Sequence, residues 1–251
     1  MLNLMRYFPG STYDLVDVWT DGVYPYRNMV KFYKYLSARP SRWRFFNHLT
    51  NTAPNLFFAK AHSRFMCEKK IRKRIAAYDP DVVVSVHPAM NYAPRHATQK
   101  LSKEHGKHIL FFTVVTDLGS AHGMWFERDV EKVYVASDRL RRLAKRRGRI
   151  PNRKIVLNGL PLRHDFVTQA DNIGDRTTES GKLYQNEIRK VLGVDTNKKT
   201  VLVMGGGEDV GSLSDIVNKL YVKFAEQGVD VTIFVVCGRN EKLKNELAVR
   251  D

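Results

Sequence analysis

The stretch of this sequence with the clearest chemical meaning is a glycine-rich turn in its last quarter. An apolar strand pattern at 200–204 runs into Gly205, Gly206 and Gly207, and a helical pattern begins at Ser212. Backbone N–H groups at the start of a helix attract anions, and glycine lets a phosphate approach the main chain closely. Two interpretations fit these residues equally well: a site for a nucleotide diphosphate and a plain strand-to-helix turn.

Two earlier apolar runs end in groups that could move a proton. His87 follows the run at 82–86, and Asp117 follows the run at 108–115. Ligands of open parallel sheets bind beyond the carboxyl ends of strands, so both residues are candidates for an active site. His87 is a candidate general base or phosphate donor, and its alternative role is that of a capping histidine. Asp117 either aligns a base or a sugar hydroxyl, or it caps the next segment.

The elements that must position these groups alternate between strands and helices. We expect strands at 13–19, 82–86, 108–115, 132–136 and 155–157, and helices at 57–77, 94–103 and 139–147. Such alternation predicts an α/β fold with a mainly parallel sheet. This first domain, 1–165, is expected to join a second domain, 183–251, through a polar linker at 166–182.

The chain is strongly basic. Its 251 residues carry a net charge of +16, which predicts an acidic partner such as nucleic acid, an anionic lipid surface or a phosphorylated substrate. Thirteen lysines and arginines lie within 27–74 beside a single acid, Glu68, and aromatic residues are interleaved with them. This combination suits a membrane interface, although single-stranded nucleic acid is bound by similar surfaces. A second basic run, 139–154, fits a lipid surface and a solvated helix face equally well.

Several kinds of site have no support in the sequence. The two cysteines, Cys67 and Cys237, lie far apart and make neither a disulfide framework nor a zinc site. No apolar run reaches the roughly 18 residues of a membrane-spanning helix. The signatures of zinc proteases, α/β-hydrolases, P-loop proteins and the common nucleic-acid-binding domains are missing. We therefore expect the protein to bind no metal, no cofactor and no nucleic acid. The alternative interpretation is a nucleic-acid-binding α/β protein.

Six segments along the chain carry a resemblance to a known family. They are DLVDVWTD (14–21), YDPDVVVSVHPAMNYAP (78–94), FFTVVTDL (111–118) with the following His122 and Trp125, NGLPLRHDF (158–166), VLVMGGGEDVG (201–211) and VVCGRNEKL (235–243). Together and in this order they resemble the monogalactosyldiacylglycerol synthase family of glycosyltransferases. The resemblance implies a GT-B fold, with two Rossmann-like domains and mainly parallel sheets.

The resemblance also implies a function. Members of the family transfer galactose from UDP-galactose to diacylglycerol with inversion at the anomeric carbon, which makes monogalactosyldiacylglycerol. The implied partners are UDP-galactose, diacylglycerol and anionic membrane lipids of the phosphatidic acid or phosphatidylglycerol type. The implied location is the plastid envelope, as a peripheral membrane protein. A related lipid glycosyltransferase with another sugar or acceptor is the alternative.

Roles for individual residues follow from the same resemblance. The expected catalytic residues are His87 and Asp117. The expected donor-binding residues are Gly205, Gly206, Gly207, Glu208, Gly238 and Arg239. The acceptor or the membrane is expected to contact Pro88, His122, Trp125, Lys69, Lys70, Arg72, Lys73 and Arg74.

Two segments typical of the family are not found in this sequence. One is a glycine-rich loop ending in histidine, GGGH, which lies beside the acceptor in the family and rivals His87 as the catalytic base. The other is a later glycine and glutamate stretch that grips the diphosphate and the ribose. We therefore expect the chain to be a fragment that lacks both ends, with an incomplete second domain, and to be inactive alone.

Overall fold

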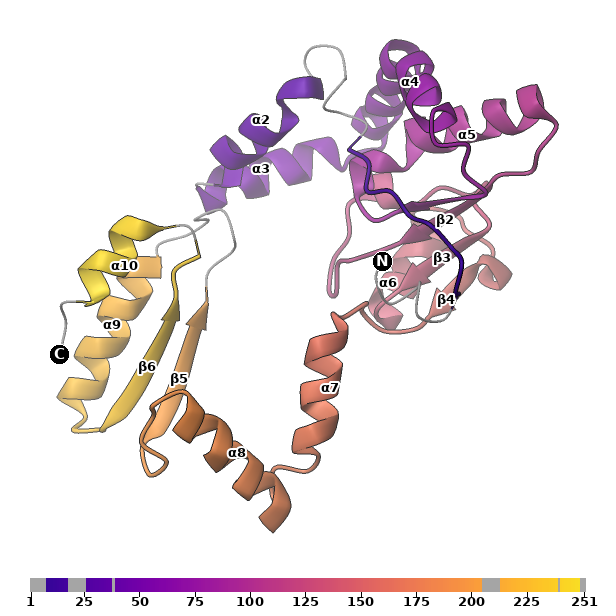
Figure 1. The fold of residues 1–251 in the computed structure, drawn as a ribbon. Coiled ribbons are helices and arrows are strands. Elements are labelled where there is room, and N and C mark those ends of the chain that lie inside the picture. Colours follow the sequence, from indigo (N-terminus) through magenta and orange to yellow (C-terminus); the bar gives the residue numbers. More distant parts are fainter. Residues whose placement is uncertain (1–7, 18–25, 38, 205–212, 239, 249–251) are drawn as a thin grey trace. The chain divides into compact units, whose positions relative to one another are not determined.

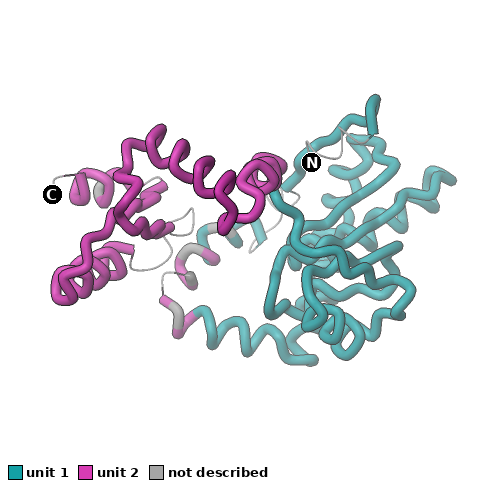
Figure 2. Tube along the Cα trace, turned by 90° about the horizontal axis from the view of Figure 1, so that it is seen from below, with its two compact units in different colours: residues 1–32, 43–162 teal, residues 33–42, 163–251 magenta. Residues whose placement is uncertain are grey.

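The computed structural model describes the chain outside residues 1–7, 18–25, 38, 205–212, 239 and 249–251 (Figure 1). The chain divides into two compact units, shown in two colours in Figure 2. Unit 1 consists of residues 1–32 and 43–162, and unit 2 of residues 33–42 and 163–251. Unit 1 therefore holds the candidate catalytic and acceptor residues, and unit 2 holds the candidate donor-binding residues.

Unit 1 is built on a parallel sheet with the strand order β1-β2-β3-β4. The strands are β1 (Val82–Ser85), β2 (Leu110–Val114), β3 (Lys132–Val135) and β4 (Ile155–Leu157), and the helices α5 (Tyr92–His105) and α6 (Asp138–Arg146) connect β1 to β2 and β3 to β4. In the register of the first pair, Ser85 lies opposite Thr113. The predicted α/β fold with parallel strands is confirmed.

Unit 2 contains a parallel pair of strands. They are β5 (Lys199–Met204) and β6 (Val231–Val236), with α9 (Leu213–Glu226) between them in sequence, α8 (Glu179–Val191) before them and α10 (Glu241–Ala248) after them. Lys199 lies opposite Val231, and Met204 lies opposite Val236. This strand–helix–strand unit and the sheet of unit 1 agree with the predicted GT-B type of fold, in which two Rossmann-like domains carry parallel sheets.

The long helix α4 (Ala53–Ala76) is the main support of α5. Pro54 stands in its first turn, where the N–H that proline lacks would have no partner within the helix. Cys67, Ile71 and Ile75 recur every four residues, so they form one buried face of the helix. This face and the buried side of α5 make one apolar cluster. The predicted helix at 57–77 is thus present, and it begins four residues earlier.

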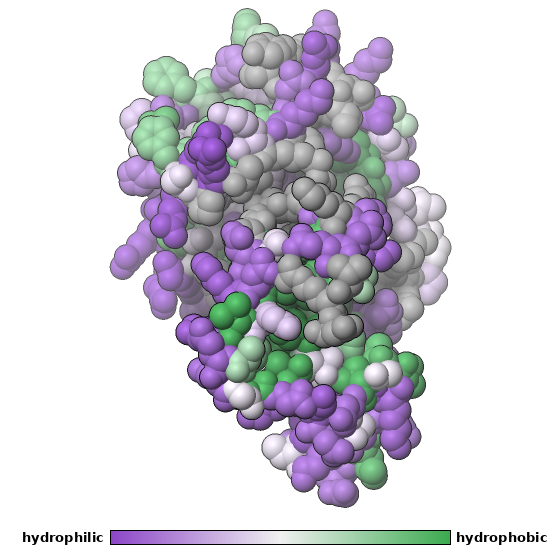
Figure 3. Space-filling model, turned by 90° about the vertical axis from the view of Figure 1, so that its left-hand side faces the viewer, coloured by the Kyte–Doolittle hydropathy of each residue, from purple (hydrophilic) through white to green (hydrophobic). Residues whose placement is uncertain are grey.

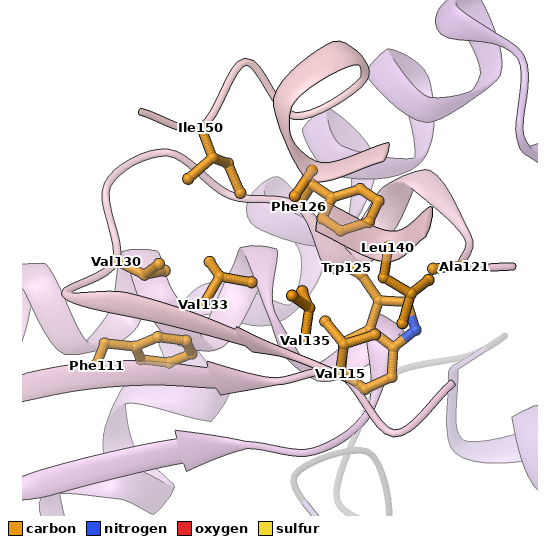
Figure 4. Close-up of a cluster of buried hydrophobic side chains, with 11 residues drawn as sticks. Phe111, Val115, Ala121, Trp125, Phe126, Val130, Val133, Val135, Leu140 and Ile150 are labelled. Carbon is orange, nitrogen blue, oxygen red and sulfur yellow. The ribbon is translucent and has the colours of Figure 1, made fainter. Parts of the chain in front are cut away.

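A second apolar cluster fills the space between the sheet and α6 (Figure 4). In Figure 4 the Trp125 ring lies among Val115, Ala121 and Leu140. Leu140 and Ala144 are four residues apart and fully buried, so α6 turns its apolar face to the sheet and its arginines to solvent. This cluster fixes the loop that follows β2, which carries several candidate site residues.

Shorter elements complete the fold. They are α2 (Met29–Ser37), α3 (Pro40–Thr50), α7 (His164–Ile173) and the 3-10 turns η1 (Tyr26–Asn28), η2 (Pro88–Met90), η3 (Gly123–Trp125) and η4 (Asn152–Lys154). Phe32 of α2 meets Phe46 of α3 edge to face, with ring centroids 5.3 Å apart. Other aromatic side chains remain exposed, among them Phe57 and Phe65 of α4. Figure 3 likewise shows apolar residues, in green, at the surface between hydrophilic ones.

One sequence expectation is wrong, and another segment needs a fuller description. The described part of the strand predicted at 13–19, residues 13–17, is not a strand. Alternation alone does not make a strand without a partner, and among the described strands β1 pairs with β2 alone. The stretch predicted as a linker, 166–182, contains most of α7 and the start of α8. Within the described residues, no helix is long and apolar enough to cross a membrane, and no cluster of metal-ligating side chains is found.

Candidate active site

His87 and Asp117 follow neighbouring strands of the unit 1 sheet. Because β1 and β2 run parallel, their carboxyl ends lie at the same edge of the sheet. Burial lowers the pKa of His87, and the negative charges of Asp17 and Asp117 oppose that shift. The three side chains are therefore close enough for their charges to interact. The structure brings the two candidate catalytic residues to one place, although they are 30 positions apart in the sequence.

The local hydrogen bond of His87 restricts its chemistry. His87 caps η2, and its Nδ1 accepts the backbone N–H of Ala89 at 3.3 Å. A neutral imidazole has one accepting nitrogen and one N–H, so its proton lies on Nε2 in this arrangement. The ring can then donate a hydrogen bond from Nε2 to a ligand. To act as a base, its Nδ1 would first have to give up the bond to Ala89.

Asp117 is oriented by a buried tryptophan. The indole Nε1–H of Trp125 donates to Oδ2 of Asp117 at 2.8 Å. Trp125 is only 1% exposed, and the apolar cluster of Figure 4 holds its ring. One carboxylate oxygen of Asp117 is thus fixed by the core, and Oδ1 has no hydrogen bond within the described part of the chain. A direct contact between Trp125 and an acceptor stays a prediction.

His122 caps η3 and joins it to α3. Its Nδ1 accepts the backbone N–H of Met124 at 3.3 Å, and its Nε2 lies 3.1 Å from Oγ1 of Thr50. Burial is the largest cause that lowers the pKa of His122, the positive charge of Arg147 adds to it, and Asp117 opposes it. Both ring nitrogens of this histidine are therefore occupied by protein groups.

A buried asparagine that sequence reasoning did not single out holds the same loop. Asn91 is fully buried; its Nδ2 donates to the carbonyl oxygen of Trp125 at 3.2 Å, and its Oδ1 accepts from Oγ1 of Thr113 at 2.9 Å. It therefore ties η3 to strand β2, and through Trp125 it helps to position Asp117. No spacing or charge pattern around Asn91 sets it apart from a surface asparagine.

A buried charge network, also unforeseen, supports the loop on its other side. Burial raises the pKa of Glu127, and the positive charges of Lys60 and Arg95 oppose that shift. Lys60 Nζ lies 2.6 Å from the Glu127 carboxylate, and Arg95 Nη1 lies 3.2 Å from Oδ2 of Asp129. The network connects α4 and α5 to the segment just after Trp125. Its members are distant in sequence, so only the fold reveals their pairing.

Comparison with known proteins identifies the relationship of this chain. The family model described as monogalactosyldiacylglycerol (MGDG) synthase matches residues 4–162, which is most of the chain and includes the whole site described above. The chain belongs to the monogalactosyldiacylglycerol synthase family. Outside the match lie the described strands β5 and β6 of unit 2.

Matches to individual members of the family show what share of their length this chain covers. It is 30% identical to monogalactosyldiacylglycerol synthase 1, chloroplastic, of Arabidopsis thaliana, over 94% of this chain and 42% of that protein. It is 32% identical to a probable monogalactosyldiacylglycerol synthase, chloroplastic, of Nicotiana tabacum, over 93% of this chain and 42% of that protein. For monogalactosyldiacylglycerol synthase 2, chloroplastic, of Arabidopsis thaliana the values are 28%, 96% and 50%. The chain therefore spans half or less of the length of these synthases.

The donor-binding residues expected from the synthase family fall mostly outside the described residues. Gly205, Gly206, Gly207, Glu208 and Arg239 belong to that part of the chain. Gly238 follows β6 with a φ of 57°, a left-handed conformation that favours glycine. Their role in a synthase donor site stays a prediction.

The expected membrane residues of α4 differ among themselves. Lys69, Lys70, Lys73 and Arg74 are exposed. Arg72 instead bonds to two carboxylates, with its Nε 3.0 Å from Oε1 of Glu68 and its Nη1 on Glu104. Arg72 therefore stabilises the contact of α4 with α5, and the four exposed cations remain candidates for a synthase surface that meets lipid. Pro88, the remaining acceptor candidate, opens η2 directly after His87.

Proposed function

We propose that this chain is part of an inverting galactosyltransferase that moves galactose from UDP-galactose to diacylglycerol, with unit 1 binding the acceptor. The family match over 4–162 supports this, and so do the names of the relatives. The observation that carries the proposal is the meeting of Asp117 and His87 at one edge of the matched sheet. A carboxylate and an imidazole at that edge are groups that can take and direct the proton of an acceptor hydroxyl.

The hydrogen bonds favour a division of labour between the two residues. Asp117 Oδ2 is held by Trp125, so Oδ1 is the oxygen that would take the hydroxyl proton. His87 keeps its proton on Nε2 while Nδ1 accepts from Ala89, so it would donate a hydrogen bond and orient the hydroxyl. We therefore propose Asp117 as the base within this chain and His87 as its orienting partner.

The departing diphosphate would be stabilised in unit 2. Gly205, Gly206 and Gly207 follow strand β5, where backbone N–H groups before α9 suit the charge that develops on the leaving group. Gly238 and Arg239 would face the same ligand from the end of β6. The carboxylate of Glu208 and the diphosphate would repel each other, so Glu208 would cap the helix or contact the sugar.

Membrane association is the third part of the proposal. Relatives named chloroplastic support a peripheral location at the plastid envelope. Exposed aromatic side chains on α4, such as Phe57, Phe58 and Phe65, accompany its exposed cations. Such a surface would place the rings among lipid head groups and the cations on anionic lipids of the phosphatidic acid or phosphatidylglycerol type.

Galactosyl transfer measured on the natural full-length polypeptide tests the proposal. Radiolabelled UDP-galactose and diacylglycerol in mixed micelles with anionic lipid are expected to give a galactolipid of inverted anomeric configuration. Product formed only from UDP-glucose would favour a related lipid glycosyltransferase. No transfer from either donor, together with a salt-dependent gel shift of RNA, would favour the nucleic-acid-binding interpretation and overturn the proposal.

The membrane part has its own test. Replacing Lys69, Lys70, Lys73 and Arg74 by serine is expected to weaken binding to anionic vesicles by about 1 kcal/mol per charge that meets the surface. Vesicles of neutral phosphatidylcholine are the control, because they offer no net negative charge. Unchanged flotation with anionic vesicles would exclude this face of α4 as the lipid contact.

A further inference from the structure

The main chain just after Asp117 is held by a serine from the neighbouring strand. Ser137 follows β3, which pairs with β2, and its hydroxyl donates to the carbonyl oxygen of Leu118 at 2.7 Å. Leu118 is the residue directly after Asp117. The bond therefore connects the loop that carries the proposed base to the end of the next strand of the sheet.

Ser137 is itself fixed in place by a second hydrogen bond. Its Oγ accepts the backbone N–H of Leu140 at 3.3 Å, so it is the N-cap of α6. Leu140 is fully buried in the apolar cluster of Figure 4, which joins α6 to the sheet. A hydroxyl has one proton to donate and two lone pairs that accept, so both bonds form at once. Ser137 thus presents a donor to the loop from a firmly packed support.

Few other contacts hold the loop between β2 and η3. Within the described part of the chain, no backbone group of residues 116–121 forms a hydrogen bond with another backbone group. A Cβ at Gly119, the residue after Leu118, would meet open space, and glycine has more backbone freedom than other residues. The restraints on this loop therefore come from side chains. At Asp117 and Leu118 they are the bonds from Trp125 and Ser137.

The two bonds restrain different parts of the loop. The Trp125 indole N–H fixes Oδ2 of Asp117, whereas Ser137 fixes the peptide group that follows Leu118. A carboxylate held at one oxygen alone can still turn about that oxygen, which changes the direction of Oδ1. The second restraint, on the adjoining main chain, opposes this turn. It matters for proton transfer because a displacement of about 1 Å in a reacting group can lower a rate about a hundredfold.

We propose that Ser137 is a positioning residue for galactosyl transfer, which sets the direction of Asp117 Oδ1 by holding the main chain at Leu118. The inference rests on the proposed function, because it needs Asp117 to be the base. The hydroxyl proton of Ser137 is directed at the Leu118 carbonyl oxygen. Ser137 therefore acts through Asp117 and not on the acceptor itself.

Steady-state kinetics of the natural full-length polypeptide test this role. Ser137→Ala is expected to lower kcat about tenfold and to leave KM for diacylglycerol within about twofold, because the acceptor still binds but its proton is taken less well. Ser137→Thr keeps a hydroxyl that can cap the helix and donate to Leu118, so it should restore most of kcat. An unchanged kcat in Ser137→Ala would overturn the proposal.

A second helix cap provides a matched control. Thr178 caps α8 by accepting the backbone N–H of Gly181 at 3.2 Å, and its hydroxyl donates to the carbonyl oxygen of Asp175 at 2.7 Å. Thr178→Ala therefore removes the same two kinds of bond from unit 2, outside the residues matched by the family model. Equal falls in kcat in Ser137→Ala and Thr178→Ala would reflect the loss of a helix cap and would overturn the proposal.

A double variant shows whether Ser137 acts through Asp117. In a chain that already carries Asp117→Asn, Ser137→Ala should change kcat by less than about twofold, because the group that Ser137 positions is gone. A further fall as large as the one in the wild-type background would mean that Ser137 acts independently of Asp117, which would overturn the proposal.

The position of Asp117 can also be followed without any transfer reaction. The Trp125 indole N–H, assigned in NMR spectra by its loss in Trp125→Phe, is protected from hydrogen exchange while it donates to Asp117. Ser137→Ala should speed this exchange about tenfold, whereas Thr178→Ala should not. Unchanged exchange in Ser137→Ala, with normal transfer by the wild type, would refute the role of Ser137 alone. Faster exchange without any transfer by the wild type would refute the proposed function and leave the hold of Ser137 on Asp117 intact.

Discussion

The turns η2 and η3 show that one local arrangement can serve two purposes. Each begins after a histidine, His87 or His122, at the side of the sheet where neighbouring strands end. In both, Nδ1 accepts the backbone N–H two residues later at 3.3 Å. Burial lowers the pKa of both histidines, and the charge of Asp117 opposes the shift in both. Sequence and local geometry alone would give the two histidines the same role.

The far nitrogen of each ring makes the difference. Nε2 of His122 lies 3.1 Å from Oγ1 of Thr50, so this histidine fastens η3 to α3. Nε2 of His87 has no hydrogen bond within the described residues, so it is left to meet a ligand. A capping histidine therefore becomes structural or reactive according to what a distant segment places against its second nitrogen.

Removing the charge of Asp117, which acts on both histidines, is expected to have the largest effect on activity. Asp117→Asn keeps a group that can accept from Trp125, but it removes the proposed base, so kcat for galactosyl transfer should fall by about a thousandfold. Asp138→Asn, on the exposed start of α6, is the control for a lost carboxylate. A fall in kcat of only a few-fold would show that Asp117 is not the catalytic base.

The loop under η3 can be tested without any activity. Asn91→Leu leaves the Thr113 hydroxyl and the Trp125 carbonyl without their buried partner, and the free energy of unfolding should fall by about 3 kcal/mol in urea unfolding. The double variant Asn91→Leu, Thr113→Val removes both members of one hydrogen bond. Its loss should be smaller than the sum of the two single losses, and strict additivity would show that the two side chains are not coupled.

The fold could largely be predicted from the sequence, whereas the buried residues that hold the candidate site in place could not. Continuous apolar runs such as 82–86 and 155–157 mark buried parallel strands, so the order of strands and helices follows from pattern. The meeting of His87 and Asp117 also follows, because ends of neighbouring parallel strands share an edge. The segment 13–17 shows the limit, since its residues alternate as in a strand but pair with no strand in the part of the chain that the structure describes.

Asn91 and Glu127 show why the remaining part of the site could not be foreseen. Each is polar and would be expected at the surface, yet each is buried against partners from other elements. Asn91 reaches Thr113 and Trp125, which lie 22 and 34 positions away in sequence. Only packing decides which polar residues become buried supports, and a single sequence carries no signal for such pairings.

Separate substitution of the two histidines should affect activity mainly at His87 and stability mainly at His122. His87→Gln is expected to lower kcat about tenfold with little change in unfolding, because its Nε2 bonds to no protein group in the described chain. His122→Gln should lower the free energy of unfolding by about 1 kcal/mol through the bond to Thr50, with a smaller effect on kcat. The comparison of η2 with η3 would be broken if both variants lost activity and stability to the same extent.

The smallest effect, and the sharpest distinction, concerns Arg147. The charge of Arg147 helps to lower the pKa of His122, whereas the charges that shift the pKa of His87 are those of Asp17 and Asp117, so Arg147→Gln should raise the pKa of His122 more than that of His87. NMR titration of the imidazole signals measures both values in one sample. Because burial lowers both pKa values, the unfolded chain takes up protons first as the pH falls below about 6.5, and acidification destabilises the fold. Arg147→Gln should reduce the share of that loss due to His122. An equal change in the pKa values of His87 and His122 would mean that the two histidines share one electrostatic environment. It would contradict the distinction drawn between η2 and η3.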